Sequence, residues 1–119
     1  MSRNLSNTNM VYEQNSKFFT RRSRNVGCMV HNALKQKGFE LYFHKQKGEC
    51  DFLIKEGLKI TQAIQVCLSI EEEEVKTREV RGLTEAMEIY GLKRGLILTL
   101  DEEMQLDNID VLPAWKFLL

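Results

Sequence analysis

Four polar side chains on two neighbouring apolar runs are the residues of this chain that could do chemistry. Glu49 and Asp51 belong to one run, and Gln65 and Cys67 belong to the next. Because successive side chains of a strand point to opposite faces, each pair shares one face of its strand. Carboxylate and amide oxygens are ligands for hard cations such as Mg²⁺, and a bound Mg²⁺ can promote phosphodiester hydrolysis. The pattern therefore predicts a nuclease-like site, either active or inactive.

Each of these residues also has a purely structural interpretation. Asp51 would cap backbone amides at a strand end, and Glu49 would be a partly exposed acid at a strand edge. Cys67 would be an inert thiol of the core. The histidines His31 and His44 have no matching ligand spacing, and we interpret them as surface or internally hydrogen-bonded residues.

Length and composition predict one soluble domain. A chain of 119 residues with 43% hydrophobic and 29% charged residues is typical of a single globular domain. No apolar run approaches the roughly 20 residues of a membrane span, and the N-terminus lacks the apolar segment of a secretory signal. Three cysteines without a Cys-x-x-Cys spacing argue against a disulfide framework and a zinc cluster. We therefore expect a cytoplasmic protein with free thiols and no membrane partner.

The net charge of zero hides a strong asymmetry along the chain. Residues 1–48 hold nine Lys or Arg and two acids, a balance of +7, whereas residues 49–119 hold eight Lys or Arg and fifteen acids, a balance of −7. A basic region attracts phosphate-bearing ligands, so this asymmetry favours an anionic partner. The alternative is that both regions present ordinary solvated faces.

The basic side chains of the first region are interleaved with aromatic ones. The candidates for contacting a nucleic-acid backbone are Arg21, Arg22, Arg24, Lys45 and Lys47. The neighbouring basic and aromatic residues are Lys17, Phe18, Phe19, Tyr42 and Phe43. The alternative is that the basic residues form the wet face of a helix while the aromatic residues are buried.

The hydrophobic pattern predicts where these residues lie. Residues 1–22 are expected to form a polar, flexible arm and residues 23–119 the folded domain. A first helix is predicted from Ser23 or Asn25, either of which can cap it, to Gly38. Its apolar stripe would be Val26, Met29, Val30, Ala33 and Leu34.

Three extended runs then predict a meander over residues 40–44, 50–55 and 60–70. After an acidic block, Thr77 is expected to cap a second helix that ends at Gly91.

A continuous apolar run over residues 95–99 predicts a buried strand with parallel neighbours, and residues 109–112 predict a last strand. Trp115 and the apolar residues after it are expected to pack on the core. The resulting order is α-β-β-β-α-β, an α/β fold in which helices flank a mixed central sheet.

This order and these residues resemble the PD-(D/E)XK nuclease superfamily. Asp51 matches the Asp of the family motif, and Gln65-Val66-Cys67 occupies the (D/E)-x-K position. The resemblance is strongest to the nuclease-like domain that follows the ATPase module in many bacterial and archaeal AAA-type ATPases. It is carried by Gly48-Glu49-Cys50-Asp51-Phe52, Ile64-Gln65-Val66, Arg78-Glu79, Leu96-Ile97-Leu98-Thr99 and the closing run from Leu112 to Leu119. The resemblance implies a restriction-endonuclease-like core that uses Mg²⁺ or Mn²⁺ when it is active.

The sequence departs from the active family pattern at the motif itself. Cys67 stands where the family has lysine, and a thiol with a reference pKa of about 8.5 carries no positive charge at neutral pH. Gln65 is a neutral ligand, so the predicted metal set of Asp51, Glu49 and Gln65 would hold a cation weakly. The resemblance allows a lysine from elsewhere, such as Lys47 or Lys59, to replace the missing one.

Two functions remain open on the sequence alone. The first is a nuclease-fold domain that binds nucleic acid, with weak or absent metal-dependent hydrolysis. The second is a non-catalytic interaction domain derived from an AAA-type ATPase, since the chain has no phosphate-binding loop of its own. Its partner would be a second copy in a homodimer or an ATPase-type protein.

Overall fold

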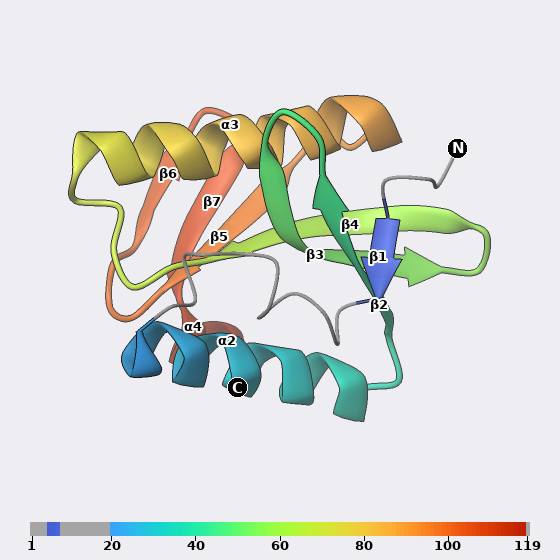
Figure 1. Ribbon diagram of the computed structural model, residues 1–119, viewed down its shortest axis with the longest axis horizontal. Coiled ribbons are helices and arrows are strands. Elements are labelled where there is room, and N and C mark those ends of the chain that lie inside the picture. The colour runs from blue at the N-terminus through green and yellow to red at the C-terminus, as the bar shows by residue number, and fades with distance from the viewer. Residues whose placement is uncertain (1–4, 8–19, 119) are drawn as a thin grey trace.

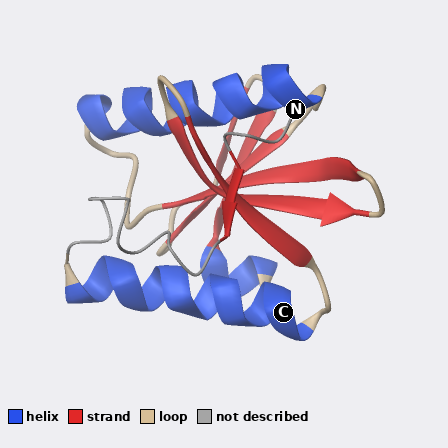
Figure 2. Ribbon diagram, turned by 45° about the vertical axis from the view of Figure 1, so that its right-hand side comes forward, coloured by secondary structure: helices blue, strands red, loops and turns tan. Residues whose placement is uncertain are grey.

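A seven-stranded mixed sheet lies between helices on its two faces (Figures 1 and 2). The computed structural model describes residues 5–7 and 20–118. The strands are β1 (Leu5–Asn7), β2 (Glu40–Lys45), β3 (Glu49–Glu56), β4 (Lys59–Val66), β5 (Gly95–Thr99), β6 (Met104–Leu106) and β7 (Ile109–Pro113). The helices are α2 (Arg21–Gln36), α3 (Glu73–Tyr90) and α4 (Ala114–Phe117).

The strands follow the order β1-β2-β3-β4-β5-β7-β6. Strands β2, β3 and β4 form an antiparallel meander, whereas β5 runs parallel to both β4 and β7. The predicted α-β-β-β-α-β order, the mixed sheet and the central position of residues 95–99 are therefore confirmed. None of the helices among the described residues is long and apolar enough to cross a membrane.

Two hydrophobic clusters hold the helices on the sheet. The cluster under α2 and α4 contains Val30, Phe43 and Leu98, whereas the cluster under α3 contains Leu83 and Ile97. Because Ile97 and Leu98 are neighbours in β5 and both are fully buried, this strand is covered on both faces. That explains its continuous apolar sequence.

Helix α2 begins two residues before the first residue predicted to cap it. Thr20 is the N-cap and accepts a hydrogen bond from the Ser23 backbone N–H at 3.1 Å. Ser23 lies inside the first turn, where its hydroxyl donates to the Thr20 carbonyl oxygen at 3.0 Å. Of the predicted stripe, Val26, Val30 and Leu34 are buried, but Met29 is 51% exposed.

The boundary predicted between the arm and the domain also differs from the structure. Strand β1 lies within residues 1–22 and pairs with β2 at the edge of the sheet. Helix α2 takes in Arg21 and Arg22 from the same range. The rest of the predicted arm, including Lys17, Phe18 and Phe19, lies outside the described residues.

Helix α3 begins at Glu73 and not after Thr77 as predicted. Glu73 and Glu74 occupy its first turn, where negative charge interacts favourably with the positive end of the helix dipole. The helix ends at Gly91 as predicted, and Gly91 adopts the left-handed conformation with φ of 69°.

The remaining differences concern strand ends and the C-terminus. Strand β4 ends at Val66, short of the predicted residue 70, and β6 was not predicted. Trp115 was expected to pack on the core but is 60% exposed. Phe117, two residues later, does pack against the cluster under α2.

Candidate nuclease-like site

Asp51 and Gln65 meet where β3 and β4 stop pairing. The ladder between the two strands runs from the pair of Glu56 and Lys59 to the pair of Phe52 and Ile64. Beyond it, the Asp51 N–H donates to Gln65 Oε1 at 3.0 Å, and the Val66 N–H donates to Asp51 Oδ2 at 2.7 Å. Each side chain thus takes the place of a missing ladder partner, and the two predicted site residues lie together.

The other end of the Gln65 amide joins this junction to α3. Its Nε2 donates to the Glu49 carbonyl oxygen at 2.6 Å and to the Glu79 carbonyl oxygen at 3.0 Å. Gln65 is 1% exposed and Asp51 is fully buried. An amide suits this position because it offers an acceptor and a donor at once, which a carboxylate does not.

Two glycines allow α3 to lie this close. A Cβ atom on Gly82 would fall 2.0 Å from the Glu49 carbonyl oxygen and 2.9 Å from Gln65 Nε2. A Cβ atom on Gly48 would fall 2.8 Å from the Cα atom of Gly82. Any larger residue at position 82 would push α3 away from the start of β3 and from Gln65.

Glu49 does not share the surroundings of Asp51. Its carboxylate pairs with Lys45 of β2 at 3.5 Å and is one-third exposed, whereas Asp51 is buried. Strict alternation fails in this part of β3, because Cys50 and Leu53 lie in the same cluster under α3. A register shift in the pairing with β2, between Tyr42 and His44, accompanies the irregularity.

Cys67 is a thiol outside any disulfide and is 8% exposed. It lies in the apolar cluster under α3, next to the end of β4, and its backbone N–H donates to the Leu98 carbonyl oxygen at 3.0 Å. The position at which the predicted motif requires a positive charge is thus occupied by a small side chain packed among apolar ones.

The two lysines that could replace the missing motif lysine, Lys47 and Lys59, lie outside the parts of β3 and β4 that form the junction. Lys59 begins β4, six residues before Gln65, which corresponds to about 20 Å of extended chain. Figure 1 shows the β3–β4 hairpin reaching away from the end of the sheet at which α3 begins. Lys59 therefore lies at the opposite end of β4 from Gln65. Lys47 lies in the turn after β2, in a pocket that also involves Arg81.

Sequence reasoning left one buried acid out of the site. Glu79 is 1% exposed, and its Oε2 accepts hydrogen bonds from Arg78 Nη2 at 3.2 Å and Nε at 3.4 Å. The signal was present in the sequence, because Glu79 falls at helical spacing from the buried Leu83, Ala86 and Met87. An acid that is buried within an apolar stripe needs a charged or hydrogen-bonding partner, so this pattern singles out Glu79.

Within the described residues, no group of three or more His, Cys, Asp or Glu side chains is arranged to hold a metal ion. Asp51 is the carboxylate that the junction supplies, and Gln65 adds an amide oxygen. The carboxylates of Glu49 and Glu79 pair with Lys45 and Arg78. This donor set is poorer in converging negative charge than a Mg²⁺ site usually is.

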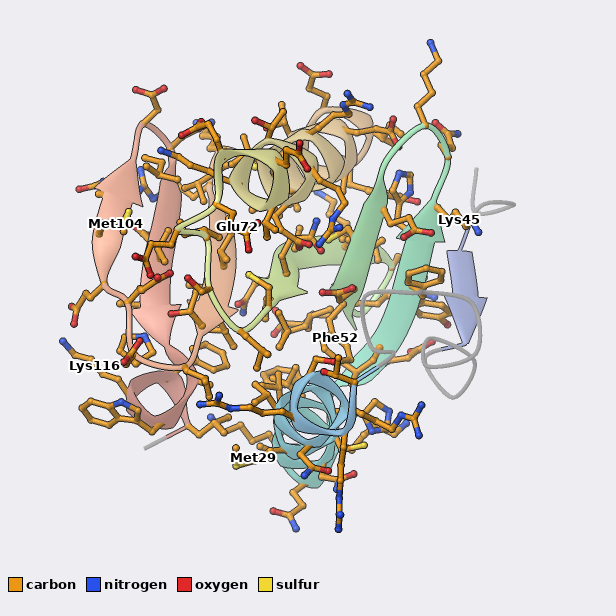
Figure 3. All side chains as sticks on the ribbon, turned by 60° about the vertical axis from the view of Figure 1, so that its left-hand side comes forward. Met29, Lys45, Phe52, Glu72, Met104 and Lys116 are labelled. Carbon is orange, nitrogen blue, oxygen red and sulfur yellow. The ribbon has the colours of Figure 1, made fainter. Side chains whose placement is uncertain are left out.

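The predicted basic residues are exposed. Arg21, Arg22 and Arg24 surround the start of α2, whose first turn contains no acid. Lys45 is exposed but paired with Glu49, and Lys47 is exposed in the following turn. Figure 3 views the molecule from the end at which α2 and α3 begin, with Lys45 near one edge and Met104 near the other. Of the aromatic residues grouped with them, Phe43 is fully buried.

His44 is neither exposed nor a partner of the junction. It is fully buried, and its Nε2 lies 2.8 Å from Glu85 Oε2 on α3. The Gly48 N–H donates to both oxygens of the same carboxylate at 3.2 Å. In the described part of the chain, Nδ1 of His44 has no hydrogen-bond partner. The expectation of an internally hydrogen-bonded histidine holds for Nε2.

A scan against family models and searches of curated proteins and of solved structures found no protein that matches this chain.

Proposed function

We propose that this chain is a nuclease-fold domain that binds nucleic acid and whose metal-dependent hydrolysis is weak or absent. The observation that carries the proposal is the junction of Asp51 and Gln65 at the end of β4, on the side of the molecule at which α2 begins (Figure 1). The PD-(D/E)XK resemblance of the sequence favours the same assignment.

The chemistry of the junction supports weak catalysis. Hydrolysis of a phosphodiester needs a cation held by converging carboxylates and a positive group that stabilises charge on the phosphate. Asp51, Gln65 and Glu49 are the residues that would hold Mg²⁺ or Mn²⁺. The Gln65 oxygen already accepts a backbone hydrogen bond, and the Cys67 thiol is not a cationic group. Any residual cleavage would therefore depend on Mg²⁺ or Mn²⁺ and be slow.

The charge at the start of α2 supports nucleic-acid binding. A cation at a helix N-terminus is unfavourable by about 0.3–1 kcal/mol, because the dipole is positive there. Arg21, Arg22 and Arg24 all lie in or next to this turn. They do not stabilise the helix, but together with its dipole they form a positive surface suited to phosphate groups.

The test is binding of fluorescein-labelled DNA and RNA oligonucleotides, single- and double-stranded, followed by anisotropy from 50 to 200 mM salt. We expect affinity to fall steeply with salt, and the double variant Arg21→Glu/Arg24→Glu to bind at least about tenfold more weakly with a salt slope lower by about two. The matched control is Lys59→Glu/Lys93→Glu, which changes charge equally at exposed positions away from α2. Absence of salt-dependent binding by the unmodified protein would refute the proposal.

An interaction domain is the second candidate, and one observation favours it. Trp115 is 60% exposed and Met104 is 43% exposed, and aromatic residues and Met are enriched at protein–protein interfaces. If nucleic acid does not bind, sedimentation of the protein alone tests for the homodimer, and Trp115→Ala should then shift it to monomer. If the protein is a monomer at all concentrations, the partner of the interaction domain would be an ATPase-type protein and not a second copy of this chain.

A further inference from the structure

Arg78 is an exposed guanidinium held in place by a buried carboxylate. Its Nε and Nη2 both approach Glu79 Oε2, at 3.4 and 3.2 Å. Arg78 is 60% exposed while Glu79 is 1% exposed, so the ion pair joins a buried carboxylate to a guanidinium at the surface. A fixed fork loses less conformational entropy when it binds an anion than a free side chain does. The carboxylate behind it leaves Nη1 for a ligand.

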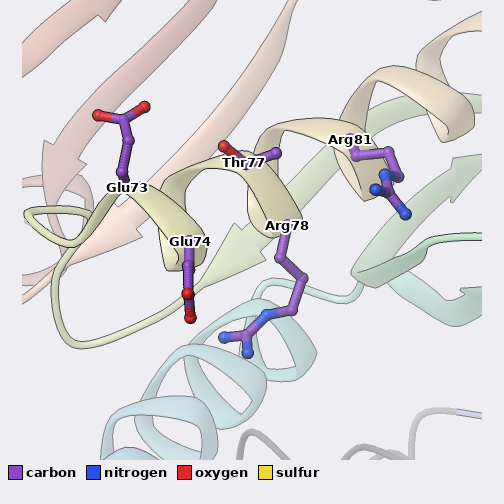
Figure 4. Close-up of a pocket in the computed structure, with 5 residues that line it drawn as sticks. All are labelled: Glu73, Glu74, Thr77, Arg78 and Arg81. Atoms are coloured by element: carbon purple, nitrogen blue, oxygen red, sulfur yellow. The ribbon is translucent and has the colours of Figure 1, made fainter.

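Arg78 lines an open pocket of about 490 Å³ on the side of α3. The other lining residues are Glu73, Glu74, Thr77 and Arg81. Figure 4 shows the acids at one end of the pocket and Arg81 at the other, with Arg78 and Thr77 between them. Because Arg78 and Arg81 are three residues apart on a helix, their Cβ atoms lie about 5–6 Å from each other. Two guanidinium groups at this spacing can reach one phosphate or two successive ones.

A second pocket lies beyond Arg81, on the side away from Glu73 and Glu74. Arg81 also lines this pocket of about 700 Å³, in which Lys47, Gln46 and Thr84 supply further donors. Two acids border this second pocket. The Glu85 carboxylate is directed to His44 and to the Gly48 N–H, whereas Glu88 is exposed. A row of three cations therefore runs from Arg78 through Arg81 to Lys47.

We infer that this row is the track of a nucleic-acid backbone, with Arg78 and Arg81 as phosphate contacts that the sequence did not assign. The strand would run along the side of α3 from the first pocket to the turn after β2. Thr77 adds a hydroxyl donor, and Glu73 and Glu74 repel phosphate at the other end, which limits the track on that side. Glu79 acts as a positioning residue for Arg78. The inference rests on the proposed function and gives it a defined path.

The experiment measures anisotropy of a labelled oligonucleotide with the variants Arg78→Gln, Arg81→Gln and Arg78→Lys. Each glutamine variant should weaken binding about five- to tenfold and lower the salt slope by about one. Arg78→Lys should keep the slope but still weaken binding, since lysine keeps the charge and loses the fork. Arg81→Gln leaves the Arg78 and Glu79 pair intact, so it tests the track even if Arg78→Gln disturbs the fold. Lys76→Gln, on the same helix but outside both pockets, is the matched control.

Two results separate the track from the wider proposal. Unchanged affinity and slope in both glutamine variants, with weaker binding in Arg21→Glu/Arg24→Glu, would overturn the track and leave the proposed function in place. No binding by the unmodified protein would overturn both. Loss of affinity in Lys76→Gln equal to that in Arg81→Gln would also overturn the track, because charge alone would explain the effect.

Discussion

Gln65 has a structural reason to be an amide. Its Oε1 accepts from the Asp51 N–H while its Nε2 donates to two carbonyl oxygens, one on β3 and one on α3. A glutamate in the same place would direct a charged oxygen at those carbonyls within a buried site. Gln65 is therefore an amide at a position where its hydrogen bonds join α3 to the sheet.

We expect Gln65→Glu to lower the free energy of unfolding by about 2–4 kcal/mol at pH 7, because two hydrogen bonds are lost and a charge is buried. Urea denaturation measures the change. Gln62→Glu is the control, since Gln62 lies on the same strand and is exposed, and it should change stability by less than about 0.5 kcal/mol. Equal stability of the two variants would show that the amide does not hold this junction.

Cys67 tests the assignment of the motif. We expect Cys67→Lys to raise any Mg²⁺- or Mn²⁺-dependent cleavage of an oligonucleotide, because it would introduce a positive charge at the position that the proposed PD-(D/E)XK resemblance assigns to the lysine of the motif. The same change costs stability, since the side chain is 8% exposed in an apolar cluster. Cys67→Met is the control for packing without charge. A folded Cys67→Lys variant as inert as Cys67→Met would argue against this placement of the site.

At the scale of elements, Glu85 fastens α3 to the turn between β2 and β3. Its carboxylate, 17% exposed, accepts from the Gly48 N–H and lies 2.8 Å from His44 Nε2. The same turn approaches α3 closely where Gly48 faces Gly82, and this contact leaves no room for a side chain at either position. This contact sets the distance between α3 and the start of β3, where Asp51 lies.

We expect Glu85→Ala to destabilise the fold by about 2–4 kcal/mol, because a buried imidazole nitrogen and a backbone N–H lose their acceptor. Glu88→Ala is the matched control, one turn further along the same helix and exposed, with an expected change within about 0.5 kcal/mol. Thermal unfolding of the two variants side by side makes the comparison. A loss for Glu88→Ala as large as for Glu85→Ala would mean that removal of any carboxylate from α3, and not the loss of this contact, accounts for the effect.

At the scale of the whole molecule, the raised pKa values of two tyrosines predict how the free energy of unfolding changes at alkaline pH. Burial, followed by the charge of Cys50, raises the pKa of Tyr90. The hydrogen bond to Glu40, then burial and the charge of Glu40, raises the pKa of Tyr42. A pKa that is higher in the folded state contributes stability that is complete below the unfolded value of about 10 and is lost as pH rises through the folded value.

The free energy of unfolding should therefore decline above about pH 10, and Tyr90→Phe should make the decline shallower. Urea titrations at several pH values between 8 and 11 measure both slopes. Tyr42→Phe, which removes the other tyrosine with a raised pKa, should also make the decline shallower. Identical slopes for all three proteins would show that these tyrosines do not govern alkaline stability.

The sequence by itself determined the order of the elements and the two faces of the sheet. Helical spacing located α2 and α3, the glycines ended them, and the continuous apolar run identified β5 as a buried parallel strand. These features follow from local periodicity and backbone preferences, which a single sequence carries. The adjacency of Asp51 and Gln65 was also within reach, because consecutive strands of a meander are neighbours.

The tertiary structure decided the features that depend on contacts between distant residues. It directed the Glu49 carboxylate to Lys45, interrupted the alternation of β3 and placed His44 against Glu85. It also paired the buried Glu79 with Arg78, at the rim of a pocket that no local pattern describes. Periodicity predicts the face on which a side chain lies. The partner that the side chain meets there is set by how α3 packs on the sheet. That packing depends on the close approach of Gly48 and Gly82, which are 34 residues apart in the sequence.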